Sequence, residues 1–499
     1  MSEHATLPAL KTIPYAFARS HGVLALRQEG ESVLVLTRLD ATLEGIAELR
    51  RVLQRPLTMR TVDGERFAAE LAAVYNQAGP VAQFSEDFSR DTDLARLLQD
   101  IAPAEDLLAA ASDAPVIRMI NALLLQALRE RASDIHFEPY ESRSVVRFRI
   151  DGALRDVIEP PRGLHAALVS RVKVMASLDI AEKRLPQDGR LALKLGDKSV
   201  DVRVSTLPTG SGERVVLRLL DKDTARLDLA LLGMSVPTLQ AVDRLIREPH
   251  GIVLVTGPTG SGKTTTLYAA MSRLDRSDLN IMTVEDPIEY ALDGVGQTQV
   301  NPRIDLSFAR ALRSILRQDP DILMIGEIRD LETAQIAVQA SLTGHLVLAT
   351  LHTNDAVSAV TRLADMGVEP YLLASSVLGV LAQRLVRCLC SDCRTAEPPT
   401  KGEAAIVEGL GLPPLPLLYK PVGCSACRDT GYRGRTGIYE LAVVDASLRR
   451  LVHDRAPEAS LRAACAAQGM TTLASDGARW LVGGTTSLAE LVRVTGSVV

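Results

Sequence analysis

Residues 251–271 read GIVLVTGPTGSGKTTTLYAAM, in which a short apolar strand leads into a loop of the form GxxxxGKT and then into a helical pattern. Glycines let such a loop curl until its backbone N–H groups point at phosphates, and the helix N-terminus adds positive potential. Lys263 is expected to contact the β- and γ-phosphates, and the Thr264 hydroxyl to bind magnesium. The stretch predicts a site for ATP and Mg2+ formed by Gly257, Pro258, Thr259, Gly260, Ser261, Gly262, Lys263 and Thr264.

The sequence that follows has the pattern of an α/β domain with a parallel sheet. From residue 251 onward, the short apolar runs GIVLVT, NIMTV, DILMIG and HLVLATL alternate with helical segments. These runs are too short to cross a bilayer, so we expect them to be buried strands. Open sheets of this class place their reactive groups beyond the carboxyl ends of the strands.

Three candidate catalytic side chains follow such strands. Glu285, in MTVEDPIEY, is a candidate for polarising the attacking water. Glu327, in DILMIGEIRD, has a Walker B arrangement, in which a carboxylate holds the magnesium shell or its water. His352 closes the strand of HLVLATLHTND and is a candidate sensor of the γ-phosphate. An acidic loop can instead cap a helix and a histidine can be a structural donor, so the three assignments depend on one another.

Two arginines of an earlier segment share a predicted polar surface. In VDVRVS, successive strand side chains alternate, so Arg203 points away from the core side of the valines. The same rule places Arg218 of RVVLRLL on one face with Arg214, and the turn TLPTGSGE joins the two strands as a hairpin. Spacing alone leaves open whether Arg203 and Arg218 are functional or only solvated.

Four of the six cysteines form two CxxC pairs, Cys390/Cys393 and Cys424/Cys427. Thiolates at this spacing are suited to tetrahedral zinc, and four protein ligands leave no position for a substrate. The pattern therefore predicts a structural Zn2+ site. Buried free thiols and a redox pair are the alternatives.

Composition and segment boundaries suggest several domains and a cytoplasmic location. The chain has 499 residues and a net charge of −5, which gives no general attraction to nucleic acid. The start, MSEHATLPALK, lacks the layout of a secretory signal. We expect an N-terminal docking domain at 1–78, an acidic linker at 79–113, an α+β domain at 114–225 and the ATPase domain at 226–499. The last is expected to include a tetracysteine subdomain at 388–430 and a C-terminal helical part.

Several further motifs carry a resemblance to a known family. They are LPQDGR, RVSTLPTGSGERVVLRLLDK, QTQVNPRIDLSFARALRSILRQDPD, LGVLAQRLVR and YRGRTGIYEL. With the motifs above they resemble the secretion and type IV pilus ATPase superfamily and, within it, the assembly ATPases of type II secretion. The resemblance covers about residues 113–499 and extends weakly to IPYAFARSHGV near the start.

The resemblance implies an architecture and partners. A RecA-like domain would follow a PAS-like α+β domain, and six copies would form a ring with ATP between these two domains. Arg203 and Arg218 would then contact phosphate. The ring would move an inner-membrane platform of the protein F type and add pseudopilin subunits to a fibre. The N-terminal domain would dock onto the cytoplasmic domain of a membrane-anchored secretion protein of the protein L type, which places the motor at the inner membrane.

Other functions remain to be distinguished. A type IV pilus extension ATPase shares the tetracysteine and most nucleotide motifs. A nucleic-acid translocase would need a basic channel and stacking aromatic residues, which 3% aromatic residues and the acidic balance do not favour. An inactive scaffold does not fit the intact set of Lys263, Glu285 and Glu327.

Overall fold

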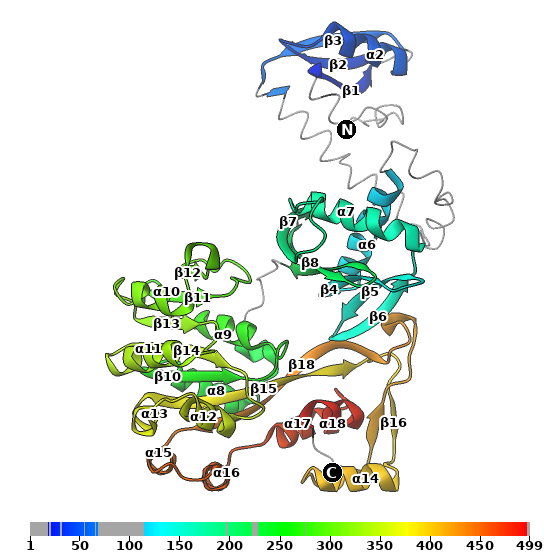
Figure 1. Ribbon diagram of the computed structural model, residues 1–499. Coiled ribbons are helices and arrows are strands. Elements are labelled where there is room, and N and C mark those ends of the chain that lie inside the picture. The colour runs from blue at the N-terminus through cyan, green and yellow to red at the C-terminus, as the bar shows by residue number, and fades with distance from the viewer. Residues whose placement is uncertain are drawn as a thin grey trace.

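The computed structural model describes residue 18 and residues 21–29, 32–53, 55–64, 66–67, 114–195, 198–221, 228–274 and 276–496. The described elements form a small N-terminal unit, a middle α+β unit and a large α/β unit with a C-terminal extension (Figure 1). The expected acidic linker at 79–113 lies outside the described residues. In the described part of the chain, no helix combines the length and the apolar character needed to cross a membrane.

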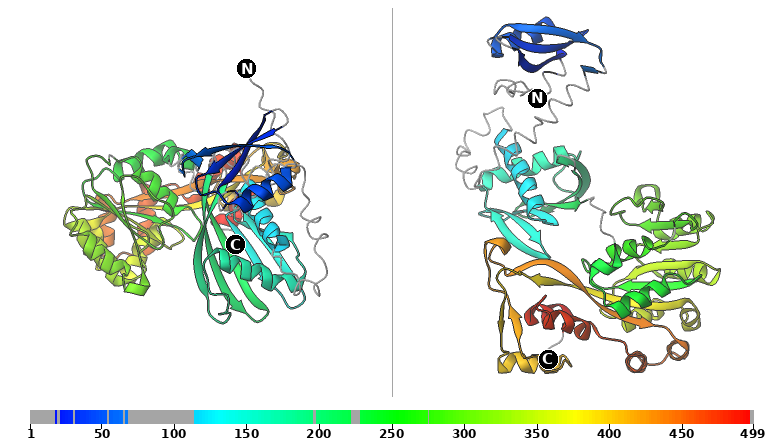
Figure 2. Two further views of the ribbon diagram at one scale, coloured as in Figure 1. Left: turned by 90° about the horizontal axis from the view of Figure 1, so that it is seen from above. Right: turned by 180° about the vertical axis from the view of Figure 1, so that it is seen from behind.

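The N-terminal unit is a three-stranded sheet covered by one helix. Its elements are β1 (Val23–Glu29), β2 (Ser32–Arg38), α2 (Leu43–Leu53) and β3 (Leu57–Val62). The central strand β2 pairs antiparallel with β1 and parallel with β3. Leu49 and Leu53 of α2 pack with the buried side chains of the sheet in one small core. In Figure 1 and in the right-hand view of Figure 2, this unit lies at the opposite end of the molecule from α14.

The middle unit is a six-stranded sheet packed against two helices. Its elements are α6 (Ala114–Arg129), β4 (Asp134–Pro139), β5 (Ser144–Ile150), β6 (Ala153–Ile158), η2 (Arg162–Leu164), α7 (His165–Met175), β7 (Gln187–Leu195), β8 (Lys198–Thr209) and β9 (Gly212–Asp221). The strand order is β6-β5-β4-β9-β8-β7. Alternating residues such as Val202, Val204, Val215 and Leu217 face α6 and α7 in a single core, because side chains alternate along a strand.

The large unit is built on a seven-stranded sheet of order β12-β11-β13-β14-β10-β15-β18. All of its pairings are parallel except that of β18 with β15. The predicted α/β fold with a parallel sheet is therefore confirmed. The strands are β10 (Gly251–Thr256), β11 (Ile281–Glu285), β12 (Gly296–Gln299), β13 (Ile322–Ile325), β14 (Leu346–Leu351), β15 (Val377–Leu389) and β18 (Tyr432–Val443).

Helices cover both faces of this sheet, which explains why its strands are continuous apolar runs. Leu254 of β10 belongs to the core beneath α10–α13, whereas its neighbour Val255 belongs to the core beneath α8 and α9. Asp330 caps α11 by accepting from the backbone N–H of Thr333 at 2.8 Å, which is a standard helix start. The helical elements are η3 (Leu229–Leu232), α8 (Val236–Leu245), α9 (Lys263–Met271), η4 (Pro302–Ile304), α10 (Phe308–Ile315), α11 (Leu331–Leu342), α12 (Ala356–Asp365) and α13 (Pro370–Ser376).

The long strands β15 and β18 extend beyond the large sheet and carry the cysteine-containing subdomain (Figure 1). The remaining elements are β16 (Thr395–Glu397), α14 (Lys401–Gly409), β17 (Leu418–Lys420), η5 (Ser425–Cys427), α15 (Ala446–His453), α16 (Glu458–Ala467), α17 (Leu473–Val482) and α18 (Leu488–Thr495). A separate apolar core joins α14, α17 and α18 to this end of the two strands.

Candidate functional site

The glycine-rich loop leaves β10 and enters α9, as its sequence pattern predicts. Gly257, Gly260 and Gly262 all have positive φ, and a Cβ on Gly257 would lie 2.5 Å from the carbonyl oxygen of Gln383. Only glycine fits this path. The Lys263 ammonium donates to the carbonyl oxygens of Gly257 at 2.8 Å and Pro258 at 3.2 Å. Burial, together with the nearby charge of Arg384, lowers the pKa of Lys263 to about 8. The loop thus presents a buried cation whose direct acceptors are neutral carbonyl oxygens.

Glu327 and His352 meet beside this loop. They follow the carboxyl ends of β13 and β14, and β14 lies between β13 and β10, so all three motifs emerge at one edge of the sheet. The imidazole Nε2 of His352 lies 3.1 Å from a carboxylate oxygen of Glu327, and the Arg329 guanidinium also contacts this carboxylate. Burial lowers the pKa of His352, and the charges of Lys263 and Arg329 add to the effect. His352 is therefore a neutral donor at neutral pH.

Glu285 lies at the end of β11 and is only 2% exposed. Its carboxylate accepts hydrogen bonds from Thr283 Oγ1 at 2.6 Å and Gln297 Nε2 at 3.0 Å, and from the Tyr268 hydroxyl on α9. A residue that polarises water needs a lone pair directed at that water. These three donors occupy three of the roughly four lone-pair positions of the carboxylate and brace α9 against the sheet, and the catalytic role expected for Glu285 stays a prediction.

The loop that follows carries two more carboxylates, Asp286 and Glu289, and the sequence reasoning did not select Glu289. Its side chain is 33% exposed and lies 3.1 Å from Nη1 of Arg203 in the middle unit. Arg203 also donates to the backbone carbonyl of Ile288. The repeated acids of EDPIEY were the available signal, but alternation along a strand cannot rank three acids at a strand end and in a loop.

Arg203 and Arg218 lie directly opposite one another on β8 and β9, so they share one face as alternation predicts. The strands extend to Thr209 and from Gly212, so the turn is shorter than the predicted TLPTGSGE. They belong to one row of cross-strand neighbours, which the structure gives in the order Arg149, Asp134, Arg218, Arg203, Arg190. Asp134 accepts from Nε of Arg218 at 2.8 Å. The row holds four arginines and one aspartate, and like charges in directly opposed positions repel. An anion bound at this face would reduce that repulsion, so the row favours anion binding.

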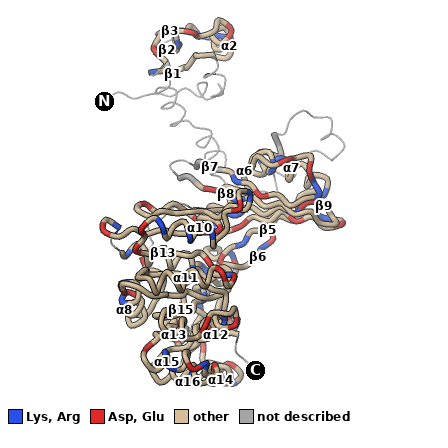
Figure 3. The backbone as a smooth tube through the Cα atoms, turned by 60° about the vertical axis from the view of Figure 1, so that its left-hand side comes forward, with Lys and Arg blue, Asp and Glu red and all other residues tan. Residues whose placement is uncertain are grey.

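This arginine row approaches the large unit. Arg190 donates to Oε1 of Gln299 at 3.0 Å, close to the contact of Arg203 with the 286–290 loop. Figure 3 shows acidic and basic positions side by side where the two units meet. Arg203 thus reaches the large unit, whereas the Arg218 side chain is 57% exposed and is held by the middle unit itself.

The four cysteines of the two CxxC pairs come together, with all ligand atoms within 4.8 Å of one another. The Sγ separations are 3.9 Å for Cys390/Cys424 and 3.7 Å for both Cys393/Cys427 and Cys424/Cys427. Tetrahedral zinc with Zn–S bonds of about 2.3 Å requires separations of about 3.8 Å. Two backbone N–H groups donate to Cys427 Sγ, from Cys424 and Gly431 at 3.2 Å each, as suits a thiolate. The geometry fits zinc.

Comparison with known proteins places these features in a family. The model described as Type II/IV secretion system protein matches residues 109–493, and a model of an N-terminal domain of GSPII protein E matches residues 12–75. The type II secretion system protein HxcR of Pseudomonas aeruginosa is 58% identical over 487 residues, covering 97% of this chain and 99% of that protein. Type II secretion system protein E of Aeromonas hydrophila is 52% identical over 492 residues, covering 98% of each.

Solved structures show the same fold. The Legionella pneumophila ATPase DotB superposes with a TM-score of 0.56 at 20% sequence identity, covering 76% of this chain and 95% of that one. The pilus retraction motor PilT with bound ADP superposes with a TM-score of 0.51 at 24% identity, covering 75% and 96%. At these identities the likeness concerns the fold alone.

Proposed function

We propose, from the premise that this chain belongs to the type II/IV secretion system protein family, that it works as a ring-shaped, ATP-hydrolysing motor of a type II secretion system. The observation that carries the proposal is the convergence of the glycine-rich loop, Glu327 and His352 at one sheet edge. The chain is an ATPase, and its relatives along nearly its full length are named for type II secretion.

The loop residues Gly257 to Thr264 would hold the phosphates of ATP. Lys263, which now donates to two carbonyl oxygens of its own loop, would exchange them for the β- and γ-phosphates. The Thr264 hydroxyl and the Glu327 carboxylate would hold Mg2+, which neutralises charge on these phosphates when bound. His352, a neutral donor 3.1 Å from Glu327, would sense the γ-phosphate.

The attacking water needs a carboxylate with a free lone pair. Glu285 is the candidate from the sequence, and three protein donors already use three of about four lone-pair positions of its carboxylate. Glu289 is part-exposed in the loop that follows and pairs with Arg203 at 3.1 Å. We therefore propose that Glu289 polarises the attacking water and that Glu285 braces α9 against the sheet.

The arginine row supports a nucleotide site shared between domains. Arg203 and Arg218 would offset negative charge developing on the γ-phosphate, as arginine fingers do. An anion brought to this face relieves the repulsion between the directly opposed arginines. A homo-hexameric ring, in which each site lies between a middle unit and a large unit, is the assembly that we propose for these contacts.

The tetracysteine subdomain would bind one structural Zn2+ through Cys390, Cys393, Cys424 and Cys427. Four thiolates close the coordination shell, so the metal would stabilise the subdomain without taking part in hydrolysis.

The cellular setting follows from the family. We propose a cytoplasmic protein that associates peripherally with the inner membrane through its partners. The N-terminal unit would dock onto the cytoplasmic domain of a protein of the L type, and the ring would drive a platform of the F type without contact to nucleic acid.

Substitution of the loop lysine and the Walker B acid tests the ATPase assignment. Lys263→Ala removes the only side-chain cation of the loop and should abolish both nucleotide binding and turnover. Glu327→Gln should retain nucleotide affinity and lose hydrolysis, because it keeps the shape of the site but removes charge near the metal. Turnover at the wild-type rate in either variant would refute the assignment.

A further inference from the structure

Strand β15 runs directly beneath the glycine-rich loop. It pairs in parallel with β10 as far as Ala382, opposite Thr256, and its next two residues are polar yet buried. Gln383 is 1% exposed and donates from Nε2 to the carbonyl oxygen of Ser261 at 2.6 Å. Arg384 is 8% exposed. Two buried polar side chains at this point are a departure from a strand that is apolar up to Ala382.

The Arg384 guanidinium is held by uncharged oxygens. Its Nη2 donates to the backbone oxygen of Asn354 at 2.8 Å and to the side-chain oxygen of Asn354 at 3.2 Å. Its Nη1 donates to the carbonyl oxygen of Gln383 at 3.2 Å. The charges of Asp355 and Glu440 act on it from nearby, but burial of a charge whose direct acceptors are neutral still costs free energy, so apolar packing alone does not explain an arginine here.

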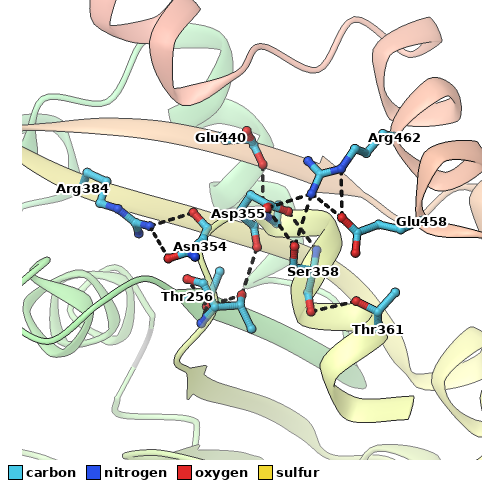
Figure 4. A network of polar contacts seen from close by, with 11 residues as sticks. Thr256, Asn354, Asp355, Ser358, Thr361, Arg384, Glu440, Glu458 and Arg462 are labelled. Carbon is cyan, nitrogen blue, oxygen red and sulfur yellow. Dashed lines mark hydrogen bonds and ion pairs between the residues drawn. The ribbon is translucent and has the colours of Figure 1, made fainter. Parts of the chain in front are cut away.

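Arg384 touches both halves of the nucleotide site. A Cβ on Gly257 would lie 3.2 Å from Nη1 of Arg384, so the guanidinium packs against the start of the glycine-rich loop. Its other nitrogen holds Asn354, two residues after His352. Figure 4 shows Arg384 reaching Asn354 beside Thr256, the last residue of β10. The Thr256 hydroxyl is in turn 2.8 Å from the hydroxyl of Thr353.

The segment 352–355 is held from its other end as well. Asp355 caps α12 by accepting from the N–H of Ser358 at 2.8 Å, and it pairs with Arg462 of α16 at 2.8 Å (Figure 4). Asp355 fixes the exit of the segment, whereas Arg384 fixes its approach to the glycine-rich loop. His352, which lies 3.1 Å from Glu327, begins the segment that these two contacts hold.

We propose that Arg384 is a positioning residue for ATP hydrolysis, which holds the 352–355 segment against the glycine-rich loop so that His352 stays beside Glu327. The inference rests on the proposed function. Arg384 acts through Asn354 and the backbone and does not touch the substrate. Its loss should therefore slow turnover more than it weakens nucleotide binding.

The test compares Arg384→Lys and Arg384→Gln with wild type in the full-length protein. We expect both variants to bind ADP within about threefold of wild type, because Lys263 and the loop amides remain. We expect kcat to fall by about tenfold or more, since hydrogen bonds to charged groups are lost. Lysine keeps the charge but cannot donate from one planar group to Gln383 and Asn354 together, so it should not rescue kcat.

Arg387→Gln is the matched control. Arg387 lies three residues further along β15 and pairs with Glu490 at 2.8 Å, and Glu490 keeps a second partner in Arg493. This variant should leave ADP affinity and kcat within about twofold of wild type. Asn354→Ala removes the side-chain acceptor of Arg384 and keeps the backbone one. In a double-mutant cycle the kcat losses should therefore overlap rather than add, since Arg384→Gln already removes the guanidinium from both contacts.

Each remaining outcome decides against the proposal. Unchanged kcat in folded Arg384→Gln would refute it. Weakened ADP binding that lysine restores would show that Arg384 acts through its charge on the phosphates. Failure of both variants to fold would show a purely structural role. Activity of the wild type and its loss in Lys263→Ala test the proposed function separately, because neither result depends on Arg384.

Discussion

Exchange of the two loop glutamates separates bracing from catalysis. In Glu285→Gln, the buried carboxylate that accepts from Tyr268, Thr283 and Gln297 becomes a neutral amide, whose carbonyl oxygen can still accept but whose NH2 group cannot. Hydrogen bonds to charged groups contribute about 1.5–3 kcal/mol and neutral ones about 1 kcal/mol. Relief of the buried charge offsets part of this difference, so we expect a net loss of about 1–3 kcal/mol of stability. For a unit of this size that corresponds to a fall in Tm of about 2–10 °C.

The matched variant Glu289→Gln should behave in the opposite way. Its carboxylate is part-exposed and forms one ion pair with Arg203, and such pairs contribute about 0–1 kcal/mol. Its Tm should therefore stay close to that of wild type. If Glu289 polarises the attacking water, its neutralisation should lower kcat by about 10²–10⁴, the usual contribution of a general base.

Two measurements on the same preparations decide between these roles: thermal unfolding followed by circular dichroism, and phosphate release at saturating ATP. Glu285→Gln, assayed well below its Tm, should keep at least a tenth of the wild-type kcat. The reasoning fails if Glu285→Gln unfolds like wild type but is inactive while Glu289→Gln turns over normally. That result would show that Glu285, and not Glu289, polarises the attacking water.

Three further predictions concern the arginine row, the metal and the N-terminal unit. Arg203→Ala and Arg218→Ala should each lower kcat strongly, since arginine fingers contribute about 10³–10⁵ in kcat, and should leave the far-UV circular dichroism unchanged. Rates within about twofold of wild type would show that neither arginine takes part in hydrolysis. Elemental analysis should find one zinc per chain, and Cys424→Ser should release it and melt the subdomain, because structural zinc contributes on the order of 10 kcal/mol; a metal-free protein of unchanged stability would contradict this. Deletion of residues 1–110 should leave ATP binding and zinc intact but abolish co-sedimentation with membranes that contain the secretion apparatus, measured at equal protein concentration; restored secretion by the truncated protein would move the docking contact elsewhere.

Local chemistry and contact with distant segments are different kinds of information, and the candidate site needs both. The glycine-rich loop could be predicted because three glycines, one lysine and the flanking strand and helix are contiguous and define their own geometry. The shared face of Arg203 and Arg218 could be predicted from alternation along two strands of a hairpin, whereas their direct opposition depends on the register that the structure shows. The cysteine spacing likewise predicted the thiol cluster found in the structure.

Tertiary structure decided which groups meet across the chain. Sequence placed Glu285 and Glu289 in one loop, but only the packing of α9 and β12 around β11 buries the first and leaves the second part-exposed. Arg384 meets a segment 30 residues away, and β15 meets the glycine-rich loop 122 residues away through Gln383; no local pattern encodes such contacts. Periodicity specifies which face a side chain occupies, whereas burial and partners depend on which elements the fold brings against that face.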